Sequence, residues 1–354
     1  FSDGLSEEML NLLTKIPEHT WGEDTTWYLS SYLGYRSYPL GDYMNWTNPQ
    51  FNAALDSPEY KMTVESWLDQ RNYLTSAVNV LEKSDVAKYS QLATDMKSAM
   101  ASIAPSLPDL DGFVKADAMN KTYTCYGVSF ALNPDMSVSL INQAGNTTAT
   151  TPANSQPRRH ALGRYTYQTL DANDFERFDK DYGMAYCTPT TEDAGCHNFN
   201  KPNMTSAHPE HTETVPTMAQ VWEKGGDDGV CALHMYGTLP TQLHEKYGAP
   251  ESLWTTVVIS DSATSSSGVT MAFDVQWFNK TATRLAEAQW VTFNPDVSLS
   301  NGKWMLRGFR TGLSDARADI GIDPTDVVTH GAVHLHSLGP FAVRGALGVV
   351  VHIP

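Results

Sequence analysis

The sequence predicts an α+β protein in which an N-terminal antiparallel helical bundle is followed by a large antiparallel β-sandwich. Two observations carry this prediction: apolar residues recur at helical spacing before residue 108 and at period two after it. Turn residues separate the period-two stretches. Because 354 residues exceed what one compact core usually holds, we expect two domains, 1–107 for the helices and 108–354 for the sandwich.

The longest helical pattern begins near Ser57-Pro58, since proline is favoured in the first turn of a helix. Its apolar stripe advances by alternating fours and threes and consists of Tyr60, Val64, Trp67, Arg71, Leu74, Val78 and Leu81. Arg71 is the charged exception. Because an unpaired buried charge is costly, we expect Arg71 to pair with a nearby carboxylate and to brace the bundle. The candidate partners are Glu65, Asp69 and Asp24.

A second long helix is expected directly afterwards, with Ser84 as its N-cap and an end before Pro105 and Pro108. Its stripe consists of Val86, Tyr89, Ala93, Met96, Met100 and Ile103. The short break before Ser84 makes the two long helices antiparallel neighbours. Together with the shorter helical patterns at 6–16 and 24–33, they predict the bundle.

The clearest strand pattern is VTMAFDVQWFN, residues 269–279, in which apolar side chains occupy alternate positions. Similar patterns occur at 123–132, 136–142, 254–260, 288–293, 303–308 and 347–353. Only residues 172–182 have a helical pattern in this part. The polar stretches 143–160 and 188–217 are expected to be long surface loops.

The charge balance of the chain excludes some classes of partner. Forty Asp and Glu against twenty-four Lys and Arg give a formal net charge of −16 and an isoelectric point near 5.0. Such a balance repels phosphate backbones and anionic membrane surfaces. We therefore expect no nucleic acid and no membrane as partner. The sequence also has no apolar run long enough to predict a membrane span.

Glycosylation signals and cysteines predict a secreted, extracellular protein. Five Asn-X-Ser/Thr acceptors occur, where chance supplies roughly one or two in a chain of this length. They are Asn45, Asn120, Asn146, Asn203 and Asn279. A disulfide between Cys187 and Cys196 would close a short polar loop. Cys125 and Cys231, both in strand-like surroundings, are candidates for a second disulfide, while other pairings remain open.

The segment PEHTWGED, residues 17–24, places a histidine and carboxylates beside a Trp-Gly pair. Taken alone, Glu18 and His19 are expected to cap the preceding helix, with the Trp-Gly pair turning the chain. Nearby aromatic residues offer a stacking platform for a sugar ring, although core packing is the commoner role of a tryptophan. They are Trp21, Trp27, Tyr28 and Trp46.

Six strings occur in order along the chain: PEHTWGED, VESWLDQRNYL, ALGRYTYQTLDANDFERFDKDY, YGAPESLW, DVQWFNKTATRLAEAQWVTFNP and DPTDVVTHGAVHLHSLG. Together they resemble a group of microbial and fungal proteins similar to glycoside hydrolase family 38, the α-mannosidases. In that family an N-terminal β/α barrel carries the catalytic nucleophile and part of a zinc site, and a helical bundle and sandwich follow it. The resemblance implies that this chain corresponds to the part after the barrel. A barrel domain or chain is then an expected partner, and the nucleophile lies outside this chain.

The resemblance makes His19 a candidate zinc ligand, because Glu18-His19-Thr20 falls where that family has a His-His-Asp motif. A neutral imidazole can give a lone pair to a zinc ion, which the barrel would share. Glu18 replaces the first histidine, and Thr20 replaces an aspartate that would contact the sugar. These departures leave the identity of the sugar open. The candidate substrate-binding residues are Trp21, Asp24, Trp46 and Arg71.

Two functions follow from the sequence. The first is the C-terminal part of a secreted, zinc-dependent retaining exoglycosidase resembling α-mannosidases, to whose active site this chain supplies only a part. The second is a catalytically inactive carbohydrate-binding or structural protein on the same fold, which the changes at Glu18 and Thr20 permit. Both functions have a carbohydrate as partner. Assembly into a homo-oligomer is left open by the sequence.

Overall fold

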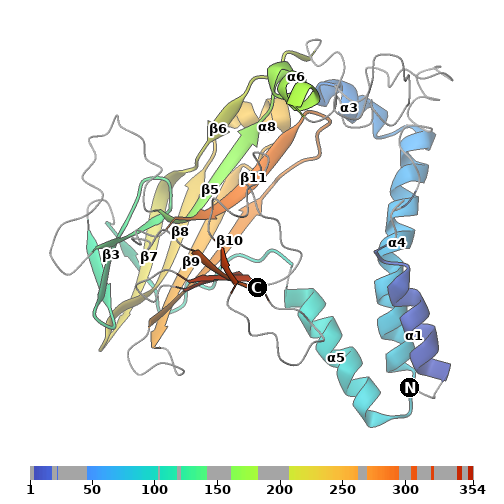
Figure 1. Ribbon diagram of the computed structural model, residues 1–354, viewed down its shortest axis with the longest axis horizontal. Helices are drawn as coiled ribbons and strands as arrows, with labels where there is room; N and C mark the ends of the chain where they lie inside the picture. Colours follow the sequence, from blue (N-terminus) through green and yellow to red (C-terminus); the bar gives the residue numbers. More distant parts are fainter. Residues whose placement is uncertain are drawn as a thin grey trace.

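A computed structural model describes residues 4–17, 22, 46–102, 104–117, 121–141, 161–181, 207–261, 269–294, 304–308, 320–322, 341–344 and 350–353. In these residues the protein combines helices with a large antiparallel sheet. This mixture confirms the predicted α+β class. Helices dominate before residue 108 and strands after it, as Figure 1 shows.

Four helices precede the first strand within the described residues: α1 (Gly4–Thr14), α3 (Asn48–Ala54), α4 (Pro58–Glu82) and α5 (Ala87–Ser102). The start of α4 is confirmed, because Ser57 Oγ accepts a hydrogen bond from the backbone N–H of Tyr60 at 3.1 Å. A capping box between Thr47 and Gln50 begins α3, a short helix that apolar periodicity did not predict. The helix expected at 24–33 lies outside the described residues.

The helices pack in pairs. α1 and α5 each contact α4, and Val78, Leu81 and Ala93 form a small buried cluster where α4 and α5 meet. Tyr89 and Met96 pack against this cluster, as the predicted stripe of α5 requires. α1 runs alongside α4, whereas α5 diverges from α4 beyond their connecting turn (Figure 1). The part of the chain that the structure describes therefore does not show a closed N-terminal bundle.

Eleven of the described strands form the main sheet: β1 (Val114–Ala116), β2 (Thr122–Cys125), β3 (Val128–Leu132), β4 (Val138–Ile141), β5 (Leu162–Thr169), β6 (Thr212–Thr214), β7 (Thr217–Gly226), β8 (Gly229–Thr238), β9 (Ser252–Asp261), β10 (Val269–Phe278) and β11 (Glu287–Phe293). The strand expected at 123–132 is instead the hairpin β2–β3. Tyr126 and Gly127 have φ values of 46° and 74°, which suit a two-residue hairpin turn.

The main sheet forks at β8. β7 pairs with β8 along one side, while β9 pairs with the other side from Ala232 onward and β2 only at Gly229. One branch is thus β1-β7-β8-β9-β10, and the other is β2-β3-β4-β5, with β6 and β11 on the two sides of β5. A disulfide between Cys125 and Cys231 joins the branches beside the fork, with the two Cα atoms 5.2 Å apart. Cys187 and Cys196 lie outside the described residues.

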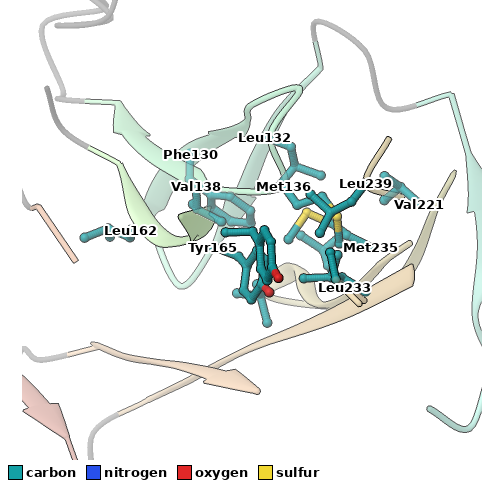
Figure 2. Packing of buried hydrophobic residues seen from close by; sticks show 14 of the residues in the cluster. Phe130, Leu132, Met136, Val138, Leu162, Tyr165, Val221, Leu233, Met235 and Leu239 are labelled. Carbon is teal, nitrogen blue, oxygen red and sulfur yellow. The ribbon is translucent and has the colours of Figure 1, made fainter. Parts of the chain in front are cut away.

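The two branches curl around the main hydrophobic core. Figure 2 shows Phe130 and Val138 of one branch across from Leu233 and Met235 of the other. Tyr165 and Tyr167 add two large side chains that are 2% and 0% exposed. The layers that the sequence predicts as a sandwich are therefore branches of one curled antiparallel sheet.

A second, four-stranded sheet has the order β13-β12-β14-β15. Its strands are β12 (Trp304–Gly308), β13 (Ile320–Ile322), β14 (Phe341–Arg344) and β15 (Val350–Ile353). Within the described residues, two helices interrupt the strands of the main sheet, α6 (Ala172–Asp181), which the sequence predicts, and α8 (Thr241–Tyr247). Both lie near α3 at one end of the main sheet (Figure 1). Within the described residues, no helix combines the length and apolar character that crossing a membrane requires.

The disulfide at the fork should contribute a large share of the stability of the sheet. It links residues 106 positions apart, so its removal frees a long loop in the unfolded chain. We expect the double variant Cys125→Ser/Cys231→Ser to lose about 2–5 kcal/mol of unfolding free energy in urea titrations. Ser129→Ala, in the same hairpin, is the matched control and should change little. An unchanged urea midpoint in the double variant would show that the fork does not depend on this bond.

Candidate functional site

The structure describes only two residues of the segment 17–24. Pro17 and Gly22 belong to the described residues, whereas His19, Trp21 and Asp24 lie outside them. The predicted zinc ligand and two of the predicted substrate-binding residues therefore stay predictions. What the structure gives is the surroundings of Gly22 and of the helices that follow.

Gly22 lies directly against α4. Its φ is +80°, and a Cβ at this position would stand 2.5 Å from Cδ1 of Trp67 and 2.9 Å from Oγ of Ser66. Both the backbone conformation and the close approach require glycine. Gly22 thus bends the chain directly against the indole of Trp67.

Trp67 packs in a small aromatic cluster. Its ring meets that of Tyr60 edge-on with centroids 6.2 Å apart, and Tyr60 meets Phe51 of α3 in the same way at 5.5 Å. Trp46 belongs to this cluster and is only 6% exposed. In the structure Trp46 fills a core, which leaves little of its ring for stacking on a sugar.

Arg71 differs from the expectation. The sequence places it on the buried stripe of α4, but the side chain is exposed. Its place on the apolar stripe therefore does not bury it, because no described element covers this part of α4. The expected pairing of Arg71 with a carboxylate stays a prediction, since the candidate partner Asp24 lies outside the described residues.

A contact between α3 and α8 connects the N-terminal helices to the main sheet. Asn48, at the start of α3, is 6% exposed, and its Nδ2 donates a hydrogen bond to the backbone oxygen of Glu245 in α8 at 3.4 Å. The next turn of α8 ends at Tyr247, whose hydroxyl accepts a hydrogen bond from the backbone N–H of Glu210 at 2.8 Å. α8 therefore connects the helical part to the end of the sheet where β5 and β6 pair.

A tyrosine–carboxylate–lysine network occupies this end of the sheet. Tyr167 of β5 donates its hydroxyl proton to Glu287 of β11, and Lys280 pairs with the other oxygen of that carboxylate at 2.5 Å. The side chains of Glu287 and Lys280 are each 20% exposed. Tyr165, two residues earlier on β5 and on the same face, donates to Oε1 of Gln289 at 2.8 Å. A carboxylate fixed by two donors is pre-organised to accept a further hydrogen bond from a hydroxyl group.

Burial dominates the ionisation of the two tyrosines. It raises the pKa of Tyr167, and the hydrogen bond to Glu287 and the charge of that carboxylate raise it further. Burial followed by the charge of Glu287 likewise raises the pKa of Tyr165. Both phenols therefore stay protonated at physiological pH and act as hydrogen-bond donors, which suits positioning of the carboxylate and amide.

A second ion pair lies on α6. His211 Nδ1 stands 2.7 Å from Asp174 Oδ2, and the backbone N–H of Asp171 also donates to this carboxylate. Burial raises the pKa of Asp174, but the hydrogen bonds from Asp171 and His211 and the charge of Arg177 outweigh it, and the net pKa is lowered. The pair ties α6 to the strand β6 that follows His211.

The described residues do not form a zinc site by themselves. No group of three or more His, Cys, Asp or Glu side chains among them is placed to hold a metal ion. His19 is not part of this set. A zinc site that uses His19 therefore stays a prediction.

Of the predicted glycosylation sites, Asn279 alone lies in the described residues. It is exposed, and its Nδ2 donates a hydrogen bond to Oε2 of Glu251 at 2.8 Å. A glycan on Nδ2 would replace that bond. The other acceptors, Asn45, Asn120, Asn146 and Asn203, lie outside the described residues.

Sequence reasoning missed the Tyr167–Glu287–Lys280 network. A signal was present: Tyr165 and Tyr167 alternate with polar residues inside the string ALGRYTYQTL, which indicates a strand with both rings on one face. Lys280 and Glu287 occur in another of the resembling strings. The pairing of residues 120 positions apart could not be read from either string.

Comparisons with known proteins give one match. A family model described as "Domain of unknown function (DUF5054)" matches residues 2–266, which is most of the chain. The matched range includes the segment 17–24 and the main sheet as far as β9. No curated protein and no solved structure matches the chain.

The contact at Gly22 can be tested with a matched glycine. Gly22→Ala adds a methyl group against Trp67 and should cost about 1–3 kcal/mol, because strain at positive φ and a steric clash act together. Gly127 also has a positive φ, +74°, but no atom lies within 4 Å of an added Cβ. Gly127→Ala should therefore cost only about 1 kcal/mol. Thermal and urea unfolding of both variants measure the difference, and equal losses would rule out the contact with Trp67.

The lowered pKa of Asp174 predicts a pH effect. A carboxylate with a depressed folded-state pKa contributes stability above its unfolded value of about 3.9, which is lost as pH falls through the folded value. Asp174→Asn should therefore unfold at lower urea than wild type at pH 6, and the gap should narrow below about pH 4. Asp227→Asn, on the exposed β7–β8 turn, serves as control. A gap that stays constant down to acid pH would contradict the assignment.

Proposed function

Since the chain belongs to the family described as domain of unknown function DUF5054, we propose that it is the part of a secreted retaining exoglycosidase that follows the catalytic barrel. The proposed substrate is an α-mannoside or a related sugar. The proposed nucleophile belongs to a barrel outside this sequence, as a domain or a separate chain. This chain alone is then expected not to hydrolyse glycosides.

The order of elements supports this proposal. Helices come first and a large curled antiparallel sheet follows, which is the order that the resemblance to glycoside hydrolase family 38 implies. In the finer architecture that we propose, the helical segments complete a bundle against the barrel, and the curled sheet is the sandwich of that family. The six resembling strings extend beyond the range matched by the family model.

One observation carries the proposal furthest: a continuous run of contacts joins the segment 17–24 to the end of the sheet. Gly22 rests on Trp67, the aromatic cluster of Trp67 and Tyr60 reaches α3, and Asn48 of α3 bonds to α8. Tyr247 of α8 then lies beside Tyr167. The hydroxyl oxygen of Tyr167 is 3.3 Å from the backbone oxygen of Tyr247. A ligand bound by segment 17–24 would therefore be supported, through these contacts, by the helices and by the main sheet.

In the proposed site, His19 binds zinc together with ligands from the barrel. When bound, the ion would polarise and orient hydroxyl groups of the sugar. The residues of this chain provide the rest: Gly22 fixes the segment against Trp67, and Trp21 and Asp24 are the proposed contacts to the sugar. The exposed Arg71 lies one turn of α4 beyond Trp67 and stays a candidate contact, whereas Trp46 is buried in the aromatic cluster against which Trp67 packs.

Secretion is part of the proposal. The disulfide between Cys125 and Cys231 is compatible with an oxidising compartment, and the exposed Asn279 is accessible to glycosylation. The net charge of −16 supports a neutral carbohydrate as substrate, because it disfavours polyanionic partners.

A second candidate function is a carbohydrate-binding or structural protein without catalysis. Glu18 and Thr20 favour it, since they replace the histidine and the sugar-contacting aspartate of the family motif. The fixed carboxylate of Glu287 is suited to binding a hydroxyl group as well. This candidate needs neither zinc nor a barrel.

The two candidates differ in an assay of the assembled, secreted protein with a panel of aryl glycosides. The enzyme proposal expects hydrolysis of at least one glycoside, with loss of about 100-fold or more in kcat after chelation of the metal or in the variant His19→Ala. Adding zinc back should restore the chelated wild type but not the variant.

His208→Ala is the matched control, because His208 is an exposed histidine before β6 that the proposal gives no role. It should hydrolyse the same glycoside at the wild-type rate. Hydrolysis that survives both chelation and His19→Ala would remove zinc from the proposal. Binding of glycans with no turnover of any aryl glycoside would establish the second candidate.

A further inference from the structure

Half-buried aromatic side chains gather on the outer face of the branch β7–β8–β9. The core side of these strands carries Val221, Leu233, Met235, Leu253 and Val257. The alternate positions face outward, and strand register places four of them side by side across β7, β8, β9 and β10. This row is Gln220, Tyr236, Trp254 and Gln276, with amides at both ends and aromatic rings between them.

Trp222 lies beside this row, because it is two residues after Gln220 on β7 and faces the same side of the sheet. Its ring stacks on that of Trp254 with centroids 5.1 Å apart and planes at 26°, and Tyr236 packs on Trp254 at 5.2 Å. Trp222, Tyr236 and Trp254 form what we call the outer aromatic cluster. Each of the three is half-buried, so every ring retains exposed surface.

The polar atoms of this cluster, and those of the neighbouring Gln220, have no hydrogen-bond partner among the described residues. No hydrogen bond there ends on the indole nitrogens of Trp222 and Trp254, the hydroxyl of Tyr236 or the amide of Gln220. None of these atoms is sealed from solvent without a partner either. Aromatic surface and unpaired donors therefore coincide on one face of the sheet, which is the combination that a sugar ring with its hydroxyl groups requires.

The segment 104–113 runs along one side of the cluster. Ser106 donates its backbone N–H to Oε1 of Gln276 at 2.7 Å, and Phe113 packs on His234 with centroids 4.2 Å apart. His234 itself is 7% exposed and bonds to Thr256 at 2.9 Å. The outer face is thus covered next to the cluster by this segment, while the cluster keeps its solvent contact.

The row that crosses the face carries no formal charge. Lys115 and Lys224 lie near the β7 side and Asp274 near the β10 side, so neither sign dominates the face. A strongly charged ligand finds no matching partner here, and the net charge of −16 further disfavours anions. The chemistry of the face therefore matches a neutral ligand with hydroxyl groups and an apolar face.

We propose that the outer aromatic cluster is a binding site for a neutral glycan chain, separate from segment 17–24. Trp254 and Tyr236 stack on the sugar ring. Gln220, the hydroxyl of Tyr236 and the indole nitrogen of Trp222 bond to its hydroxyl groups. The site holds polysaccharide whether or not the protein hydrolyses it, so it extends the proposed function and does not depend on zinc or on a barrel.

Affinity gel electrophoresis with soluble neutral polysaccharides tests this site. The probes are mannan, xylan, β-1,3-glucan and β-1,4-glucan, each incorporated in the gel with the full-length wild-type protein. We expect at least one to retard the wild type and Trp254→Ala to bind that polysaccharide about tenfold more weakly, a loss of about 1.4 kcal/mol. Trp290→Ala, a 50% exposed tryptophan on β11, should bind like wild type.

Two milder variants keep the test decisive if Trp254→Ala fails to fold. Tyr236→Phe and Gln220→Ala each remove one hydrogen-bonding group and should weaken binding several-fold with an unchanged thermal midpoint. Retardation of the wild type by none of the four polysaccharides would overturn the proposal. So would full affinity in both milder variants, or an equal loss of affinity in Trp290→Ala.

Discussion

The junction between the two branches of the curled sheet is the constraint on which the rest of the structure depends. At one end, the disulfide between Cys125 and Cys231 holds the fork where β2 meets β8 through a single register position. At the other, the hydroxyl oxygen of the buried Tyr167 of β5 lies 3.3 Å from the backbone oxygen of Tyr247 in α8, the helix between β8 and β9, so this contact joins the two branches. With both ends held, the core between the branches is closed and α8 has a fixed platform.

The helical part of the chain is attached to the main sheet through α8. α3 bonds to α8, α3 and α4 share an aromatic cluster, and Gly22 lies against Trp67 of that cluster. Gly22, the described residue beside the proposed sugar contacts and zinc ligand, is thus attached to packed helices, and a binding site requires such support. The outer aromatic cluster is on the same branch as α8 but on the opposite face from the core, so two separate carbohydrate contacts on one fold are physically compatible.

Local signals predicted much of the fold. The stripes of α4 and α5 and the strands β4, β9, β10 and β11 have clear periods, and the Ser57-Pro58 start of α4 is a local cap. The sequence failed where distant residues decide. His234 is polar yet buried beneath Phe113, which obscures the alternation of β8, and the Tyr126-Gly127 turn divides an apparently continuous strand. The sequence placed Arg71 on a buried stripe because apolar periodicity identifies one face of a helix but does not show whether another element covers that face. The Tyr167–Glu287 contact spans 120 positions, and no local pattern encodes it.

Diffraction from crystals of the assembled, secreted protein, recorded on both sides of the zinc absorption edge, tests the central claim most directly. The account predicts an anomalous peak about 2.1 Å from an imidazole nitrogen of His19, shared with side chains of a barrel and facing a cleft beside Trp21 and Asp24. An imidazole of His19 packed inside protein, with no anomalous peak and no cleft near it, would contradict the enzyme proposal. The fold and the outer aromatic cluster would then remain to explain a protein that binds glycans without cleaving them.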